Sequence, residues 1–251
     1  MKTTAIRVTS VASAAPVISI REFTAHCRTC GVRELCLPVA FTDGEVKQFD
    51  ALLTHRTKLK KQDILYRGGE RFKALYAVQF GSLKTVVLAE DGREQVIGYH
   101  MLGDIIGFDG IDNNQHQAGA IALEDTEICA LPFDSMTNLA RSIPALQQNL
   151  HRMLSTELSR AQSAMLMLGS MPAAERVAIF LLNLADRYHR RGYSSTEYVL
   201  RMTREEIGSY LGLKLETVSR QFTRFHQEGL IHVQGRSVKL LNTIALKQIT
   251  N

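Results

Sequence analysis

Three cysteines lie close together near the start of the chain, and a fourth follows far along it. Cys27, Cys30 and Cys36 form a C-x2-C-x5-C pattern inside a segment with little hydrophobic periodicity, and the fourth is Cys129. Thiolates bind zinc and iron–sulfur clusters, and a cubane cluster accepts four of them at uneven spacing. The pattern therefore predicts a metal site that ties the N-terminal segment to the domain that follows it.

Zinc, disulfides and inert thiols are the alternatives to an iron–sulfur cluster at these cysteines. Structural zinc sites usually contain a second C-x-x-C pair, which this chain lacks. The mildly apolar stretch within residues 1–20 is interrupted by Ser and Pro, so it is interpreted as a leader and the protein as cytoplasmic, where disulfides are disfavoured. We favour the cluster, because a cubane needs four thiolates and tolerates uneven spacing. Positive charge from His26, Arg28 and Arg33 would stabilise its reduced, anionic state.

A second set of residues suited to recognition lies near the C-terminus. Glu216, Ser219 and Arg220 recur at i, i+3 and i+4 on the outward face of a predicted helix. Arginine can bond guanine O6 and N7, glutamate can accept from cytosine N4, and serine can contact a base edge or a thymine methyl. The same residues also fit an ordinary ion pair between Glu216 and Arg220 on a solvated helix.

The surrounding elements have the pattern of a winged helix-turn-helix, which favours the DNA-binding interpretation. Thr203–Glu206 is a capping box that begins a short helix, and Gly212 follows that helix. A second helix is predicted over Leu215–Gln227, and Leu230–Leu240 alternates as a hairpin does. In this motif the N-terminal part of the second helix enters the major groove. The residues expected to pack the two helices together are Ile207, Leu211, Leu213, Val218 and Phe222.

The charge distribution supports a nucleic-acid partner for the C-terminal third. The net charge is +5, and residues 171–251 contain 12 Lys and Arg against 7 Asp and Glu. Residues 43–170 instead contain 13 against 16. Basic side chains contact DNA phosphates, which position a protein without reading sequence. The candidates for phosphate contacts are Arg204, Lys214, Arg224, Arg236 and Lys239.

The middle of the chain, residues 42–142, is predicted to be a β-roll sensor domain of the jelly-roll, cyclic-nucleotide-binding-like type. Short runs rich in β-branched and aliphatic residues alternate with glycines, as in closed antiparallel sheets. These runs are Leu75–Val78, Leu83–Leu88, Gln95–Tyr99, Ala120–Leu123 and Glu127–Leu131. The chain is therefore predicted to be α+β, and it contains no apolar run of the roughly 20 residues that a membrane helix needs.

Two classes of ligand known for such β domains do not match this sequence. Cupin enzymes bind metal through histidines close together on strands, whereas His55, His100 and His116 are far apart. A cyclic nucleotide needs an arginine for its phosphate, and the turn Gly103–Gly119 contains none. We therefore expect no cyclic nucleotide. Neither a nucleophile–base pair nor a Walker-type loop is found, so the chain is not predicted to be an enzyme.

A long helix is predicted over residues 143–169, between the roll and the DNA-binding domain. Its apolar residues follow heptad-like spacing: Leu154, Leu158, Ala161, Met165 and Leu168. Such a helix either packs on its own roll or forms the parallel seam of a homodimer. We favour the seam. The predicted segments are then a leader with the cysteine loop (1–41), the roll (42–142), the dimerisation helix (143–169) and the winged helix-turn-helix (170–251).

These features together resemble the CRP/FNR superfamily of bacterial transcription regulators, and within it the FNR branch, the oxygen-sensing regulators of anaerobic respiration. The resemblance extends from about residue 26 to near the C-terminus. Its most specific parts are the four cysteines, the turn Gly103–Asp109 and the stretch Glu216–Arg220. Lys214 departs from the pattern, because it stands where a helix-capping hydroxyl is expected.

The resemblance implies a homodimer that binds an inverted repeat of the TTGAT type in double-stranded DNA and contacts RNA polymerase, activating or repressing anaerobic genes. It also implies one 4Fe–4S cluster per subunit, held by the four cysteines, that promotes dimerisation when intact and is degraded by oxygen. The base-reading residues of the family correspond to Glu216, Ser219 and Arg220. Two other functions fit the residues: a zinc-stabilised, constitutive DNA-binding protein and an iron–sulfur electron carrier.

Overall fold

The structure, a computed structural model, describes residues 27–37, 40–53, 56–89 and 92–250. The chain divides into two compact units, Met1–Glu157 and Leu158–Asn251. The boundary lies inside helix α3 (Pro144–Ser170), so the helix predicted between the domains contributes residues to both units. The proposed leader and His26 lie outside the described residues. In the described part of the chain, no helix is long and apolar enough to cross a membrane.

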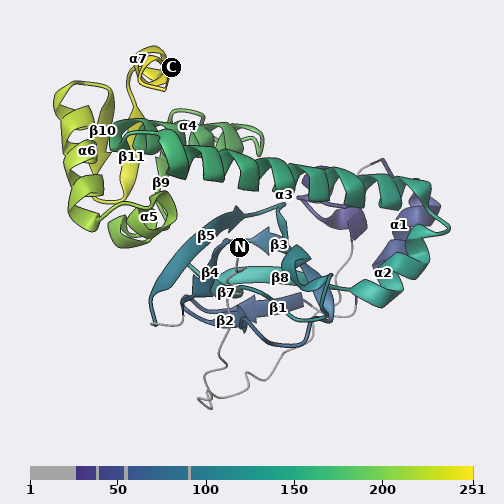
Figure 1. Cartoon of the computed structure of the whole chain (residues 1–251). Helices are drawn as coiled ribbons and strands as arrows, with labels where there is room; N and C mark the ends of the chain where they lie inside the picture. The colour runs from purple at the N-terminus through teal and green to yellow at the C-terminus, as the bar shows by residue number, and fades with distance from the viewer. Residues whose placement is uncertain (1–26, 38–39, 54–55, 90–91, 251) are drawn as a thin grey trace. The chain divides into compact units, whose positions relative to one another are not determined.

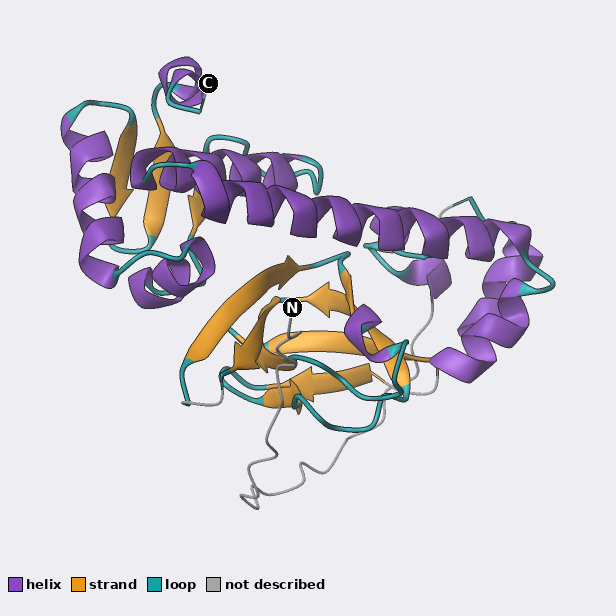
Figure 2. Cartoon of the chain, viewed as in Figure 1, coloured by secondary structure: helices purple, strands orange, loops and turns teal. Residues whose placement is uncertain are grey.

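The described part of the first unit contains two four-stranded antiparallel sheets that form a roll (Figure 2). One sheet has the order β1-β8-β3-β6 and the other the order β2-β7-β4-β5. The strands that correspond to the apolar runs of the sequence are β3, β4, β5, β7 and β8, which confirms the predicted β domain. The bounds are β1 (Arg56–Leu59), β2 (Ile64–Tyr66), β3 (Ala74–Phe80), β4 (Ser82–Leu88), β5 (Glu94–Met101), β6 (Ile105–Ile106), β7 (Gly119–Ala122) and β8 (Thr126–Pro132).

Helical segments gather at one end of this roll (Figure 1). A capping box between Thr42 and Glu45 begins α1, whose buried Val46 and Phe49 face the core. One apolar cluster contains residues of the cysteine segment, α1, α2 and the first turn of α3, including Leu37 and Leu146. The cluster thus packs the cysteine segment against α1 and the start of α3. The helical bounds are η1 (Cys27–Thr29), η2 (Arg33–Leu35), α1 (Asp43–Asp50), η3 (Phe108–Gly110) and α2 (Phe133–Ala140).

The second unit contains the winged helix-turn-helix that the sequence predicts. The Thr203 hydroxyl accepts from the amide of Glu206 and the Glu206 carboxylate accepts from the amide of Thr203, which starts α5 as a capping box. Gly208 lies within α5, and a Cβ on it would lie 2.6 Å from the carbonyl oxygen of Leu213, so the close approach of the following turn to α5 requires glycine at this position. The bounds are α4 (Ala173–His189), β9 (Glu197–Val199), α5 (Arg204–Leu211), α6 (Leu215–Gln227), β10 (Ile231–Gln234), β11 (Ser237–Leu240) and α7 (Thr243–Gln248).

Candidate metal centre and nucleic-acid interface

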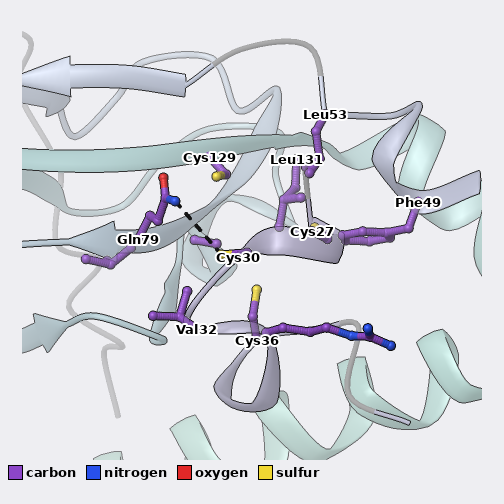
Figure 3. A pocket seen from close by; sticks show the side chains of 12 residues that line it. Cys27, Cys30, Val32, Cys36, Phe49, Leu53, Gln79, Cys129 and Leu131 are labelled. Carbon is purple, nitrogen blue, oxygen red and sulfur yellow. Dashed lines mark hydrogen bonds between the residues drawn. The ribbon is translucent and has the colours of Figure 1, made fainter. Parts of the chain in front are cut away.

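All four cysteines line one pocket of the first unit (Figure 3). Cys27 begins η1, Cys30 and Cys36 follow η1 and η2, and Cys129 comes from β8. The structure thus brings together the cysteines that the sequence analysis selected from distant parts of the chain. Much of the remaining lining is apolar: Val32, Phe49, Leu53, Ala77, Val78 and Leu131. An apolar lining excludes water, and this exclusion would protect a metal–thiolate group from hydrolysis.

The four thiols are free, and three of them are buried while Cys30 is half-buried. Among the described residues, no three His, Cys, Asp or Glu side chains converge closely enough to hold a single metal ion. A tetrahedral zinc needs every sulfur at about 2.3 Å from one metal. A cubane instead distributes its four thiolate ligands over separate iron atoms. The number and type of these donors fit an iron–sulfur group, which takes four thiolates.

Burial sets the protonation state of these thiols. It raises the pKa of Cys36 to about 12 and also raises the pKa values of Cys27 and Cys129. A hydrogen bond with the Asp50 carboxylate raises the pKa of Cys27 further, whereas the nearby Arg56 partly opposes the effect of burial at Cys129. The three thiols are therefore protonated at neutral pH without metal. Because ligating sulfur must be the thiolate, metal binding has to displace protons.

Short 3-10 turns shape the cysteine segment. The amide of Cys30 donates to the carbonyl of Cys27, and the amide of Cys36 donates to the carbonyl of Arg33, each at 3.2 Å. The amide of Cys27 also donates to the Asp50 carboxylate, which anchors the segment to α1. Sequence reasoning did not identify Asp50, because nothing near it in the chain marks it as a partner of a cysteine.

Two polar side chains beside the pocket were also absent from the predicted site. The Gln79 amide nitrogen lies 3.9 Å from the Cys30 sulfur, at the outer limit of an N–H···S contact, and Gln79 Oε1 is buried without a described partner. Arg56 lies directly opposite Cys129 in the β1–β8 register. Side chains directly opposite on antiparallel strands project to the same face. Gln79 and Arg56 are therefore placed to donate to sulfur.

The positive side chains expected around the cysteines differ in position. Arg33 lines the pocket, and its guanidinium donates to the carbonyl of Phe41 at 3.2 Å. Arg28 is exposed. Arg56, which the sequence analysis did not select, adds positive charge beside Cys129.

The turn Gly103–Gly119, considered in the sequence analysis for a cyclic nucleotide, is held together by hydrogen bonds and ring stacking within the protein. The Asp109 carboxylate accepts hydrogen bonds from the amides of Gln117 and Ala118, at 2.8 and 3.0 Å. Burial acts to raise the pKa of Asp109, but these bonds and His116 outweigh burial and lower it. His116 itself is buried and stacks on Tyr66 with ring centroids 3.7 Å apart. The turn therefore contains a carboxylate anion and, in the sequence 103–119, no lysine or arginine to offset it.

The proposed recognition residues lie on the first half of α6. Glu216 and Arg220 are exposed and Ser219 is half-buried, while Val218 and Phe222 are buried on the opposite face. Arg220 donates to the Thr217 hydroxyl at 3.4 Å. Within the described structure, no salt bridge between Glu216 and Arg220 is found. Both exposed side chains lie in the first half of the second helix, the part that enters the major groove in helix-turn-helix proteins.

The side chains proposed to contact phosphates differ in their exposure and in their partners. Lys214 and Arg236 are exposed. Arg224 pairs with Glu228 at 2.7 Å, and Lys239 pairs with Glu197 at 3.7 Å. The Arg204 guanidinium lies 3.4 Å from the centre of the Phe222 ring, and burial lowers its pKa to about 10. Arg204 therefore helps to pack α5 on α6 as well as carrying charge.

The apolar row of α3 is exposed in the single chain. Leu158 and Met165 are 61% and 73% exposed, and Leu154 and Leu168 are each 40% exposed. Ala161 is also exposed. Exposed leucines and methionines at heptad-like spacing are typical of a helix face that pairs with another helix.

Comparisons with known proteins agree with this architecture. A model of the Crp-like helix-turn-helix domain matches residues 175–249, and a model of the cyclic nucleotide-binding domain matches residues 56–142. The transcriptional regulatory protein btr of Bordetella pertussis is 43% identical over 90% of this chain and 93% of its own length. The fumarate and nitrate reduction regulatory protein of Escherichia coli is 37% identical over 89% of this chain and 90% of its own length. The chain belongs to the CRP/FNR family of transcription regulators.

A solved structure supports the same assignment for the fold of this CRP/FNR regulator. FixK2 from Bradyrhizobium japonicum is 31% identical, with a TM-score of 0.73, and the match covers 78% of this chain and 96% of that protein. The predicted α+β architecture is therefore confirmed: a cyclic-nucleotide-binding-type β domain, a long helix and a C-terminal winged helix-turn-helix. The match to the cyclic nucleotide-binding domain describes the fold of the roll.

Proposed function

We propose that this CRP/FNR regulator is a cytoplasmic, oxygen-responsive homodimer whose DNA binding depends on one 4Fe–4S cluster per subunit. The observation that carries the proposal is the convergence of four free thiols on one apolar pocket. Cys27, Cys30, Cys36 and Cys129 would hold the cluster. When bound, such a group supplies oxidisable iron held by thiolates, which air can destroy.

The exposed row on α3 supports the proposed dimer. The helix has 27 residues, which corresponds to about 40 Å. The seam Leu154, Leu158, Ala161, Met165 and Leu168 would pair with the same row of a second copy. A two-fold dimer of helix-turn-helix units reads two half-sites about 34 Å apart, as an inverted repeat of the TTGAT type requires. We propose that Glu216, Ser219 and Arg220 read its bases.

The apolar cluster of the first unit supports a link between the pocket and α3. Cys27, Cys36 and Cys129 belong to the same cluster as Ile143, which directly precedes the helix, and Leu146 in its first turn. A change in the cysteine segment can therefore alter how the beginning of α3 is held. Loading and dimerisation would then be coupled equilibria, each strengthening the other by the same factor. Occupancy of promoter DNA, with contact to RNA polymerase, would follow loading and so report oxygen.

The turn Gly103–Gly119 supports the further proposal that this regulator takes no cyclic nucleotide. The Asp109 anion already occupies backbone donors that a phosphate would use, and a second anion beside it is disfavoured.

An absorbance spectrum of protein purified without air tests the proposal most economically. We expect a brown protein with iron and sulfide in equal amounts, which binds a TTGAT inverted-repeat duplex more tightly than a scrambled duplex. After exposure to air, the colour and the preference for the inverted repeat should both be lost. A colourless protein that contains zinc and binds DNA in air would favour a constitutive regulator. A brown protein with no preference for DNA sequence would favour an electron carrier.

A further inference from the structure

One buried hydrogen bond joins the cysteine segment to α3. The Asn149 amide nitrogen donates to the carbonyl oxygen of Leu37 at 2.8 Å, across 112 positions of sequence. Asn149 is 5% exposed and Leu37 is fully buried, both inside the first unit. A buried amide or carbonyl without a partner is costly, so the bond fixes how these two segments meet.

Leu37 directly follows a proposed ligand. The carbonyl of this same residue accepts the hydrogen bond from Asn149. The residue that directly follows one pocket cysteine thus also contacts the helix. On the helix side, Asn149 lies shortly before Leu154, the first residue of the exposed row.

We infer that Asn149 is the positioning residue through which the state of the cysteine pocket is passed to the dimerisation helix. This inference rests on the proposed function. When three thiols of the segment share one metal group, Leu37 is held where its carbonyl meets Asn149. Without metal, the segment is held chiefly by 3-10 turns, the anchor at Asp50 and apolar packing. The bond to Asn149 is then strained or lost more often, and the start of α3 is less well fixed.

The variant Asn149→Leu tests this inference, because it keeps a similar volume and removes the donor. Gln148→Leu is the matched control, since Gln148 is exposed on the same helix. Each protein is prepared both anaerobically loaded with iron and sulfide and metal-free. Iron per chain, the thermal midpoint of the metal-free form and the dimer Kd of both forms, from sedimentation over a concentration series, are then measured. The readout is the dimer Kd of the metal-free form divided by the dimer Kd of the loaded form.

We expect Asn149→Leu to take up iron as the wild type does, and its Kd ratio to fall by about threefold to tenfold, the effect of one hydrogen bond. Gln148→Leu should keep the wild-type ratio. Asn149→Ser, whose side chain is too short for direct contact with Leu37, should lower the ratio with less disturbance of packing. It therefore replaces Asn149→Leu if that variant does not fold.

Three results would overturn the inference, and they separate it from the proposed function. A loaded variant with the wild-type ratio would refute the role of Asn149 alone. A variant whose iron content falls together with its ratio would mean that Asn149 builds the pocket and transmits nothing. A wild-type protein that binds no iron, or whose Kd is independent of loading, would refute the proposed function and this inference with it.

Discussion

The cysteine pocket and the recognition surface are built in opposite ways. The recognition surface is local: a capping box at Thr203, a glycine turn and α6 follow one another in the chain, and each fixes the next. The pocket joins Cys27–Cys36 to Cys129, and its polar surroundings come from three more elements, through Asp50, Arg56 and Gln79. A site built from consecutive residues keeps its structure as long as its own unit is folded. A site assembled from distant segments can change its structure when one of those segments moves.

The largest expected effect is the loss of one distant ligand. Cys129→Ser removes the thiol that joins β8 to the cysteine segment, and a cubane with one ligand missing is open to solvent and hydrolysis. We expect stable iron binding to be abolished, along with the tighter DNA binding of the loaded form. Iron analysis after anaerobic loading measures this. Cys129→Ser with the full wild-type iron content would show that the pocket is not the ligand set.

The next largest effect concerns the seam that the pocket would control. Ala161→Asp would place two like charges in a dimer interface of low dielectric, at a cost of several kcal/mol unless they are protonated or solvated. We expect dimerisation to weaken even in loaded protein. Gln162→Asp, an acid at the exposed neighbouring position, is the control. An Ala161→Asp dimer as tight as the wild type would place the subunit interface elsewhere.

The recognition surface gives a smaller, sequence-dependent effect. Arg220→Ala should cost about 1–3 kcal/mol on the inverted repeat and relax the choice at one guanine position. Arg236→Ala should instead weaken all duplexes alike and flatten the dependence on salt, because it removes a phosphate contact. Fluorescence anisotropy with matched and scrambled duplexes distinguishes them. If Arg220→Ala lost the same binding free energy on both duplexes, Arg220 would not contact a base specifically.

The smallest effect concerns the polar surroundings of the pocket. Gln79→Leu removes a donor to the Cys30 sulfur, and one neutral hydrogen bond is worth about 0.5–1.5 kcal/mol. We expect unchanged iron uptake and a few-fold faster loss of iron to a ferrous chelator under argon. Gln117→Leu is the control, because Gln117 is exposed in the turn of the roll. Equal rates of iron loss for Gln79→Leu and the wild type would mean that Gln79 packs beside the pocket without stabilising the bound iron.

The local recognition surface could be predicted from the sequence more completely than the pocket, which joins distant segments. The capping box, the glycine turn, α6 and the main strands depend on neighbouring residues, and they were predicted within a few positions. β1 was missed because Arg56–Leu59 is mostly polar, and β6 because Ile105–Ile106 is too short for any pattern. β9 and α7 were missed for similar reasons, since their lengths are three and six residues.

The partners of the cysteines could not be found in the same way. Asp50, Gln79 and Asn149 are unremarkable polar residues in the sequence, and only the packing of the roll, α1 and α3 gives them a role. The four thiols were identified because cysteine is rare here and its chemistry is narrow. The residues that position those thiols are common, so their function depends on long-range contacts that no local pattern records.

The most direct test measures colour and DNA binding in one sample. Anaerobically loaded protein is bound to a fluorescent inverted-repeat duplex, air is admitted, and visible absorbance and anisotropy are followed together. We expect the anisotropy to fall as the absorbance decays, with free protein appearing as monomer in parallel sedimentation runs. Anisotropy that stays constant after the colour has gone would contradict an oxygen-responsive regulator controlled through its cysteine pocket.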